Sequence, residues 1–456
     1  MAYQSTNPYN GQIIKSFDEI DDAQLENKLK AAQACFDQVW RHTSFAERKA
    51  VLSRAAALMR ERTHEFAQLI TLEMGKLIAQ SEGEVKLSAA ILDYYAENAA
   101  SFLAPEKLST AKGDAVVESA PIGVLFGVEP WNYPYYQIAR FAAPNLMAGN
   151  VVMVKHASNV PQCALAFERL LEEAGAPSGA YTNLFISKDQ VANVINDARI
   201  RAVALTGSEG AGAVVAQLAG KNLKKSTLEL GGSDAFIVLD DADLDNAVKH
   251  AVSGRMGNSG QACTASKRFI VVEALADRFL EKFQTAMQGF EPGDPLERKT
   301  TLAPLSSVQA LETLLGQVNE AVTHGARIVL GGQRIQGQRG AFMQPTILTD
   351  IEAGNPAYRQ EFFGPVALFF RVPDEAAAVA LANDSPFGLG GSVFTQDVER
   401  GKRVARQIDT GMVFINSAAV SMPDLPFGGV KNSGYGRELS GAGIQEFVNK
   451  KLIRVG

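Results

Sequence analysis

The chain has 456 residues, of which 46% are apolar, enough material for two or three packed domains. A formal net charge of −6 disfavours a nucleic acid or an anionic membrane surface as a partner, and no apolar stretch approaches the ~18 residues of a membrane-spanning helix. Three cysteines and five scattered histidines form neither a disulfide framework nor a metal-ligand pattern, so we expect a reducing, cytoplasmic environment and no bound metal.

The order of predicted elements indicates an α/β fold. Residues 22–104 show the composition and spacing of helices. From about residue 114, short apolar runs typical of buried parallel strands alternate with helical segments, at 124–128, 151–155, 203–207 and 236–239. A second alternation follows, with a strand at 269–272, a helix at 274–287 and a strand at 327–330. Residues 447–455 read as a strand that pairs outside its own domain.

A glycine-flanked cysteine and a glycine-flanked glutamate suggest covalent chemistry at sulfur. Cys263 ends the run Gly260-Gln261-Ala262-Cys263, and Glu229 stands before Leu230-Gly231-Gly232. A thiolate is a strong nucleophile, and a carboxylate can act as a general base toward the thiol or toward water. Because a lone cysteine is usually a small buried residue, and Leu-Glu-Leu before two glycines is usually a strand entering a turn, the pair needs support from other motifs.

Two segments are candidates for binding a phosphate-bearing cofactor. Thr206-Gly207-Ser208 follows a predicted strand and opens a helix that contains Gly212, and free N–H groups at a helix N-terminus attract phosphate. Lys155 ends another strand, at the edge where open α/β sheets bind ligands. An ordinary strand-to-helix turn and a solvated lysine explain these segments equally well when each is taken alone.

Seven motifs agree in order and spacing with one family, and together they extend over nearly the whole chain. They are Pro130-Trp131-Asn132-Tyr133-Pro134, the strand end at Lys155, Thr206-Gly207-Ser208 with Gly212, Leu228-Glu229-Leu230-Gly231-Gly232, Gly260-Gln261-Ala262-Cys263, Glu361-Phe362-Phe363-Gly364-Pro365 and Pro426-Phe427-Gly428-Gly429. On these residues the chain resembles the NAD(P)-dependent aldehyde dehydrogenase superfamily.

The resemblance implies a Rossmann-type cofactor domain, a second α/β catalytic domain and a small β oligomerisation element. We place the cofactor domain at residues 1–102 and 122–231, the catalytic domain at 232–435, and the oligomerisation element at 103–121 and 440–456. The same resemblance implies a homodimer or homotetramer built by the C-terminal strand and a hairpin at 103–121.

The chemistry implied by the resemblance is aldehyde oxidation through a cysteine thioester. Cys263 would attack the aldehyde carbon, and the Asn132 amide and the Cys263 backbone N–H would hold the oxyanion. Hydride transfer to NAD(P) would leave a thioester, and Glu229 would activate the water that hydrolyses it.

The cofactor residues implied by the resemblance include Glu361, as acceptor for ribose hydroxyls, and Phe363, beside the nicotinamide ribose. The full set is Trp131, Lys155, Ser158, Thr206, Gly207, Ser208, Gly212, Leu230, Glu361 and Phe363. NAD-preferring relatives often read Lys-Pro-Ser-Glu where this chain reads Lys155-His156-Ala157-Ser158. A serine hydroxyl tolerates a 2′-phosphate that a glutamate would repel, so we predict NADP as the preferred cofactor and NAD as a poorer one.

Arg140 suggests the substrate. It lies eight residues after Asn132, two turns along an expected helix, and resembles the arginine that holds the substrate carboxylate in the succinate-semialdehyde dehydrogenase branch. With Tyr136 and Ser421 it would bind succinate semialdehyde, to be oxidised to succinate. Some relatives carry a second arginine where this chain has Gly257.

Several alternatives remain open at this stage. An ordinary solvent-facing arginine is an alternative interpretation of Arg140, and a broader range of aldehydes or semialdehydes is an alternative substrate class. A cysteine hydrolase or acyltransferase would pair the thiol with a histidine, and the nearest in sequence is His250. A non-enzymatic scaffold protein is a further alternative, although Cys263, Glu229 and Asn132 are all present.

Overall fold

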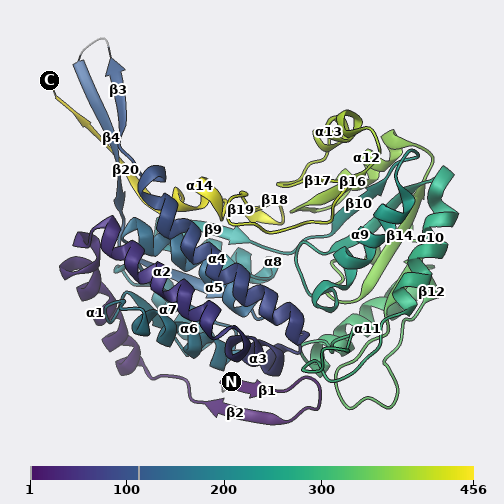
Figure 1. The fold of residues 1–456 in the computed structure, drawn as a ribbon, viewed down its shortest axis with the longest axis horizontal. Coiled ribbons are helices and arrows are strands. Elements are labelled where there is room, and N and C mark those ends of the chain that lie inside the picture. Colours follow the sequence, from purple (N-terminus) through teal and green to yellow (C-terminus); the bar gives the residue numbers. More distant parts are fainter. Residues whose placement is uncertain (1–2, 111–112, 456) are drawn as a thin grey trace.

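The computed structural model describes residues 3–110 and 113–455. Two lobes lie side by side, and a narrow β arm projects from the first of them (Figure 1). Each lobe contains a largely parallel sheet with helices packed on it, which confirms the predicted α/β fold.

The first lobe is built on a six-stranded sheet with the order β19-β9-β8-β5-β6-β7. Its strands are β5 (Val124–Glu129), β6 (Val151–His156), β7 (Tyr181–Asn183), β8 (Ile200–Thr206), β9 (Lys225–Glu229) and β19 (Gly434–Tyr435). All neighbours are parallel except β19, which returns from the C-terminal part of the chain to pair antiparallel with β9. The connecting helices are α5 (Pro134–Ala148), α6 (Pro161–Glu173), α7 (Lys188–Asn196) and α8 (Glu209–Lys221).

The N-terminal helices pack on this lobe, as the composition of residues 22–104 predicts. They are α1 (Asp22–Gln38), α2 (Phe45–Glu61), α3 (Thr63–Met74) and α4 (Ile78–Phe102), preceded by a hairpin of β1 (Tyr3–Thr6) and β2 (Ile13–Phe17). Capping boxes begin α1 at Asp21 and α2 at Ser44. Their apolar faces join one continuous core with the strands of the six-stranded sheet.

The second lobe is built on a seven-stranded sheet with the order β12-β13-β14-β11-β10-β16-β17. Its strands are β10 (Asp234–Val238), β11 (Ser266–Val272), β12 (Arg327–Leu330), β13 (Thr346–Thr349), β14 (Val366–Val372), β16 (Gly391–Phe394) and β17 (Phe414–Ile415). Only the edge strand β12 runs antiparallel to its neighbour. The helices are α9 (Leu244–Met256), α10 (Glu273–Gln288), α11 (Val308–Thr323), α12 (Glu375–Asn383) and α13 (Val398–Ala405).

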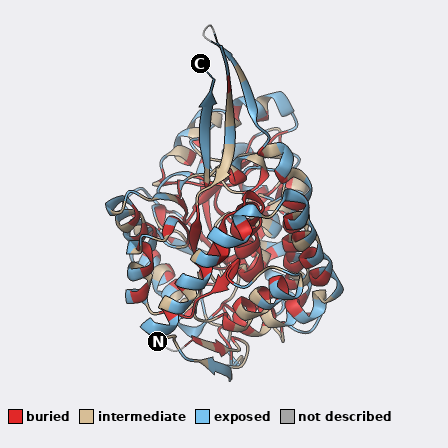
Figure 2. Cartoon of the chain, turned by 90° about the vertical axis from the view of Figure 1, so that its left-hand side faces the viewer, coloured by how far each residue is buried: buried red, intermediate tan, exposed pale blue. Residues whose placement is uncertain are grey.

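The arm is a three-stranded antiparallel sheet of β3 (Glu106–Thr110), β4 (Gly113–Pro121) and β20 (Val448–Arg454). Figure 2 shows that it stands away from the body with mostly exposed or half-buried residues. The predicted C-terminal strand is thus confirmed, since it pairs with β4. Residues 111–112 of the predicted hairpin and residue 456 lie outside the described residues. The division into three domains stays a proposal. The strand β19, which lies in the range predicted for the catalytic domain, pairs with β9 in the sheet of the first lobe.

Candidate functional site

A cavity of about 290 Å³ lies where β5, β8 and β9 of the first lobe end, next to Cys263. Loops of both lobes form its wall. Of the residues that the sequence singles out, the structure brings together here Trp131, Asn132, Thr206, Gly207, Ser208, Glu229, Leu230, Cys263, Glu361 and Phe363. The carboxyl ends of parallel strands are the usual ligand edge of an open α/β sheet.

The segment before Cys263 has an unusual backbone. Asn258 and Ser259 have φ angles of 52° and 50°, in the left-handed region that non-glycine residues rarely adopt. At Gly260, which has a φ of 78°, an added Cβ would lie 2.2 Å from the carbonyl oxygen of Gly364. The buried Arg255 donates to the Gly260 carbonyl at 2.6 Å and fixes the turn. The loop that carries the cysteine is therefore tightly held.

A buried lysine ties this loop to the opposite wall of the cavity. Lys267 Nζ donates to the carbonyl oxygens of Ala262, at 2.8 Å, and of Cys263, and it forms an ion pair with Glu361 at 2.9 Å. The Gly232 N–H also donates to Glu361, at 3.1 Å. Sequence reasoning did not find Lys267, because its position at the start of a buried strand carried no motif.

Glu229 and Cys263 form a coupled acid–base pair. The thiol and the carboxylate lie close enough to shift each other's pKa, and burial raises the pKa of Glu229 to about 7. Burial, followed by the neighbouring Glu229 charge, holds the pKa of the Cys263 thiol well above its usual value. Cys263 is therefore a thiol at neutral pH, and Glu229 is the adjacent group that can take its proton.

The sequence predicts that Arg140 faces the substrate, and the structure shows which groups its guanidinium contacts. Its side chain is 0% exposed and forms ion pairs with Glu438 and with Glu229 Oε2, the latter at 3.3 Å. It also donates to the hydroxyls of Tyr136 and Thr206, both at 3.2 Å. Two carboxylates bind the one guanidinium in place of water. Arg140 therefore contacts Glu229 inside the protein and does not line the cavity beside Cys263.

Like Arg140, the other predicted substrate residues, Tyr136 and Ser421, do not line the cavity that contains Cys263. Ser421 lies near the Tyr136 hydroxyl and lines a separate hollow of about 200 Å³ beside Pro426 and Phe427. The structure thus joins Tyr136, Arg140 and Ser421 in one chain of contacts, without placing them on the cavity that contains Cys263.

A hollow of about 350 Å³ opens on the other side of the cysteine loop, next to Ala262 and Thr264. Its polar wall comes from His250, Ser253, Thr264 and Ser417. Gly257 also lines it, and an added Cβ there would meet nothing within 4 Å. Sequence analysis named Gly257 and His250 but did not group Ser253 and Ser417 with them. The segment at 417–420 reaches the hollow only in the folded chain.

The phosphate-binding candidates lie along one edge of the first lobe. Ser208 is the N-cap of α8, and at Gly212 an added Cβ would lie 2.7 Å from the Leu230 side chain, so glycine lets α8 approach β9 closely. Lys155 and Ser158 are at and beyond the end of β6, outside the walls of the 290 Å³ cavity. Burial lowers the pKa of Lys155 to about 8.

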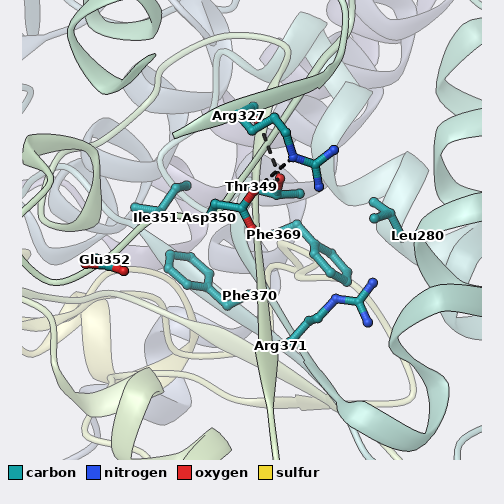
Figure 3. A pocket seen from close by; sticks show the side chains of 9 residues that line it. All are labelled: Leu280, Arg327, Thr349, Asp350, Ile351, Glu352, Phe369, Phe370 and Arg371. Carbon is teal, nitrogen blue, oxygen red and sulfur yellow. Dashed lines mark hydrogen bonds and ion pairs between the residues drawn. The ribbon is translucent and has the colours of Figure 1, made fainter. Parts of the chain in front are cut away.

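A further hollow, of about 240 Å³, lies in the second lobe between α10 and the strands β12, β13 and β14 (Figure 3). Its two arginines are already paired, Arg327 with Asp350 at 2.9 Å and Arg371 with Glu273 and Asp277. It contains no nucleophile and no free positive charge, so it offers none of the chemistry found at Cys263.

Within residues 3–110 and 113–455, no three His, Cys, Asp or Glu side chains converge as a metal site would require. None of the helices in the same described ranges is both long enough and apolar enough to cross a membrane.

The coupled pair makes a prediction about thiol reactivity. Alkylation of Cys263 by iodoacetamide should have a pH midpoint above that of an ordinary thiol, and Glu229→Gln should lower this midpoint by removing a neighbouring negative charge. Peptide mass spectrometry after timed alkylation measures the rate. The buried thiols of Cys35 and Cys163 are internal controls that should stay unlabelled in the folded protein. A midpoint that Glu229→Gln leaves unchanged would show that the two groups are not coupled.

Comparisons with known proteins agree with this geometry. The model of the aldehyde dehydrogenase family matches residues 1–453. The succinate-semialdehyde dehydrogenase [NADP(+)] of Deinococcus radiodurans is 52% identical over 99% of this chain and 94% of its own, and a probable enzyme of the same name from Synechocystis sp. is 46% identical over 99% of both chains. A crystal structure of succinic semialdehyde dehydrogenase from Streptococcus pyogenes in complex with NADP+ is 48% identical and superimposes with a TM-score of 0.98, with 100% of both chains covered. The chain belongs to the aldehyde dehydrogenase family.

Proposed function

We propose that this enzyme oxidises succinate semialdehyde to succinate, with NADP as the hydride acceptor. The observation that carries the proposal is the Cys263–Glu229 pair in a cavity that reaches the N-terminus of α8. The names of the relatives, at 52% and 46% identity over nearly the whole chain, support the substrate and the cofactor.

The residues present fit a bound dinucleotide. Gly207 and Ser208 place the start of α8 on the cavity, where its free N–H groups suit a pyrophosphate, and Gly212 leaves room for close packing beneath. Glu361 would hold the ribose hydroxyls and Phe363 would pack beside the nicotinamide ribose. Lys155 and Ser158 would meet the 2′-phosphate. When bound, the nicotinamide supplies the hydride acceptor, and the chain's own residues do the rest.

The acylation step depends on Cys263, Glu229 and Asn132. Glu229 accepts the thiol proton as sulfur attacks the aldehyde carbon. Its raised pKa, about 7, makes it a stronger base than an ordinary carboxylate, and formation of the carbon–sulfur bond makes the S–H proton easier to remove. The Asn132 side-chain N–H, which now donates to the Gln261 carbonyl at 3.1 Å, would turn to the developing oxyanion. Loss of hydride from this adduct leaves a thioester on Cys263.

Hydrolysis of the thioester uses Glu229 a second time. Once its proton has left, the carboxylate accepts a proton from water, and the hydroxide attacks the thioester carbon and releases the acid and the thiol. Arg140 lowers the pKa of Glu229 by its charge, while Glu438 raises it, so these two neighbours set how readily Glu229 is regenerated.

The hollow beside Ala262 and Thr264 is the proposed entry for the aldehyde. Its histidine, serine and threonine side chains would meet the substrate carboxylate, and Gly257 leaves space beside them. The size of the hollow, about 350 Å³, favours a second candidate function, the oxidation of larger aldehydes as well. A cysteine hydrolase has less support, because the titratable neighbour of the thiol is Glu229, while His250 accepts from the Ala418 N–H at 3.3 Å.

We further propose a homodimer or homotetramer assembled through the arm, whose β20 exposes Leu452 and Ile453.

We also propose a cytoplasmic location, because the three free thiols fit the reducing compartment expected from the sequence.

Cofactor preference tests the proposal. The kcat/KM for NADP should exceed that for NAD, and Ser158→Glu should shift the ratio toward NAD by about tenfold or more, since a carboxylate repels the 2′-phosphate. Absorbance of the reduced cofactor with succinate semialdehyde measures both values, and Ser158→Ala is the control for the lost hydroxyl. A tenfold preference of the unaltered enzyme for NAD would contradict the assignment.

The position of Arg140 predicts how its replacement acts. Arg140→Lys keeps a positive charge but loses the fork that joins Glu229, Tyr136 and Thr206, so kcat/KM should fall by similar factors, about tenfold or more, for succinate semialdehyde and for a neutral aldehyde such as butanal. The two substrates are compared under the same conditions. A loss confined to succinate semialdehyde would instead support direct binding of the substrate carboxylate by Arg140.

A further inference from the structure

A buried ion pair lies under the segment that carries Asn132, and the proposed reaction does not use it. Lys76 stands between α3 and α4, and Glu84 lies in the second turn of α4. Both side chains are 1% exposed and they contact each other directly. Two desolvated charges are costly to bury, and such a pair is weak evidence for added stability by itself. The role of the Lys76–Glu84 pair must therefore be inferred from the other groups that these two side chains contact.

Glu84 caps the helix that follows Asn132. The N-cap residue of α5, Tyr133, has no side-chain hydrogen bond to the first turn. Instead, Glu84 Oε1 accepts from the backbone N–H groups of Tyr135, at 2.9 Å, and Tyr136, at 3.3 Å. A carboxylate from another helix thus satisfies free donors at the positive end of α5 and fixes where this helix begins.

Lys76 holds Asn132 itself. Its Nζ donates to the Asn132 carbonyl oxygen at 2.8 Å and lies 3.6 Å from the centre of the Tyr133 ring. The Asn258 side chain, from the segment before Cys263, donates to the same carbonyl oxygen at 3.0 Å. The backbone of Asn132 is therefore clamped between the N-terminal helices and the cysteine loop.

We propose that Lys76 and Glu84 form a positioning pair that sets the backbone of Asn132, and through it the direction of the side-chain N–H that binds the oxyanion. The inference rests on the proposed function, since it acts through the role given there to Asn132. An oxyanion donor works only when it is aimed at the charge that develops during the reaction, so a small shift of its backbone weakens it strongly. Neither Lys76 nor Glu84 lines the cavity beside Cys263, so neither is a catalytic residue.

Glu73 provides a matched control. It is also fully enclosed, and it caps α6 in the same way, by accepting from the backbone N–H groups of Gln162 and Cys163, both at 2.9 Å. The helix that Glu73 caps, α6, does not follow Asn132. Glu73→Gln should therefore lower the thermal midpoint and leave kcat/KM within about twofold.

The test compares Lys76→Met/Glu84→Gln, which removes both charges, with Asn132→Ala and with the combination of all three changes. In the full-length enzyme with NADP and succinate semialdehyde, Asn132→Ala should lower kcat/KM by about 100-fold or more, and the Lys76/Glu84 variant by about 10-fold or more. Alkylation of Cys263 by iodoacetamide forms no oxyanion, so its rate should stay within about twofold in the Lys76/Glu84 variant. The combined variant should be no slower than Asn132→Ala alone, because the pair acts through Asn132.

The outcomes separate the inference from the proposed function. If Asn132→Ala lowers kcat/KM but the Lys76/Glu84 variant behaves like Glu73→Gln, with reduced thermal stability and unchanged turnover, the positioning role is wrong and the function stands. Additive losses in the combined variant, or alkylation that slows in parallel with turnover, would also overturn it. If Asn132→Ala itself leaves turnover unchanged, the proposed oxyanion role and the inference fall together.

Discussion

Burial of the Glu229 carboxylate beside the Cys263 thiol is the constraint on which the rest of the site depends. Exclusion of water brings the pKa of Glu229 to about 7, so that this carboxylate can both accept and release a proton near neutrality. The same exclusion keeps the sulfur protonated until a substrate arrives, because burial and the Glu229 charge raise the pKa of the thiol. One buried base can therefore serve both the cysteine and the water.

Such a carboxylate must have partners inside the protein, and the fold supplies them from distant parts of the chain. Arg140 comes from α5 and Glu438 from the segment after β19, the strand that crosses from the C-terminal part of the chain to pair with β9. Two carboxylates flank a single guanidinium, so this charge is paired although its side chain is completely enclosed. On the other wall, Lys267 joins the cysteine loop to Glu361.

The features of the fold and the site that depend on local sequence pattern could be predicted from the sequence. Continuous apolar runs identified the parallel strands, and glycines beside Cys263, Glu229 and Ser208 marked turns that converge on one cavity. The sequence did not reveal the partners of Arg140, since helical spacing gives the face of a residue but not which charged groups from elsewhere meet it. Lys76, Glu84 and Lys267 were missed for the same reason. Their roles come from contacts with backbone groups and carboxylates on other segments of the same lobe, and no local signal distinguishes a buried lysine from a solvated one.

The most direct test of the account is to trap the acyl group on Cys263. At alkaline pH, where the thiol ionises without a general base, Glu229→Gln should still pass hydride to NADP once but hydrolyse the thioester slowly. Rapid acid quenching followed by intact mass spectrometry should then show an increase of about 100 Da, that of a succinyl group in place of the thiol hydrogen. Peptide mapping should place it on Cys263. Stoichiometric formation of NADPH without any adduct, or an adduct on Cys35 or Cys163, would contradict a thioester mechanism at this site.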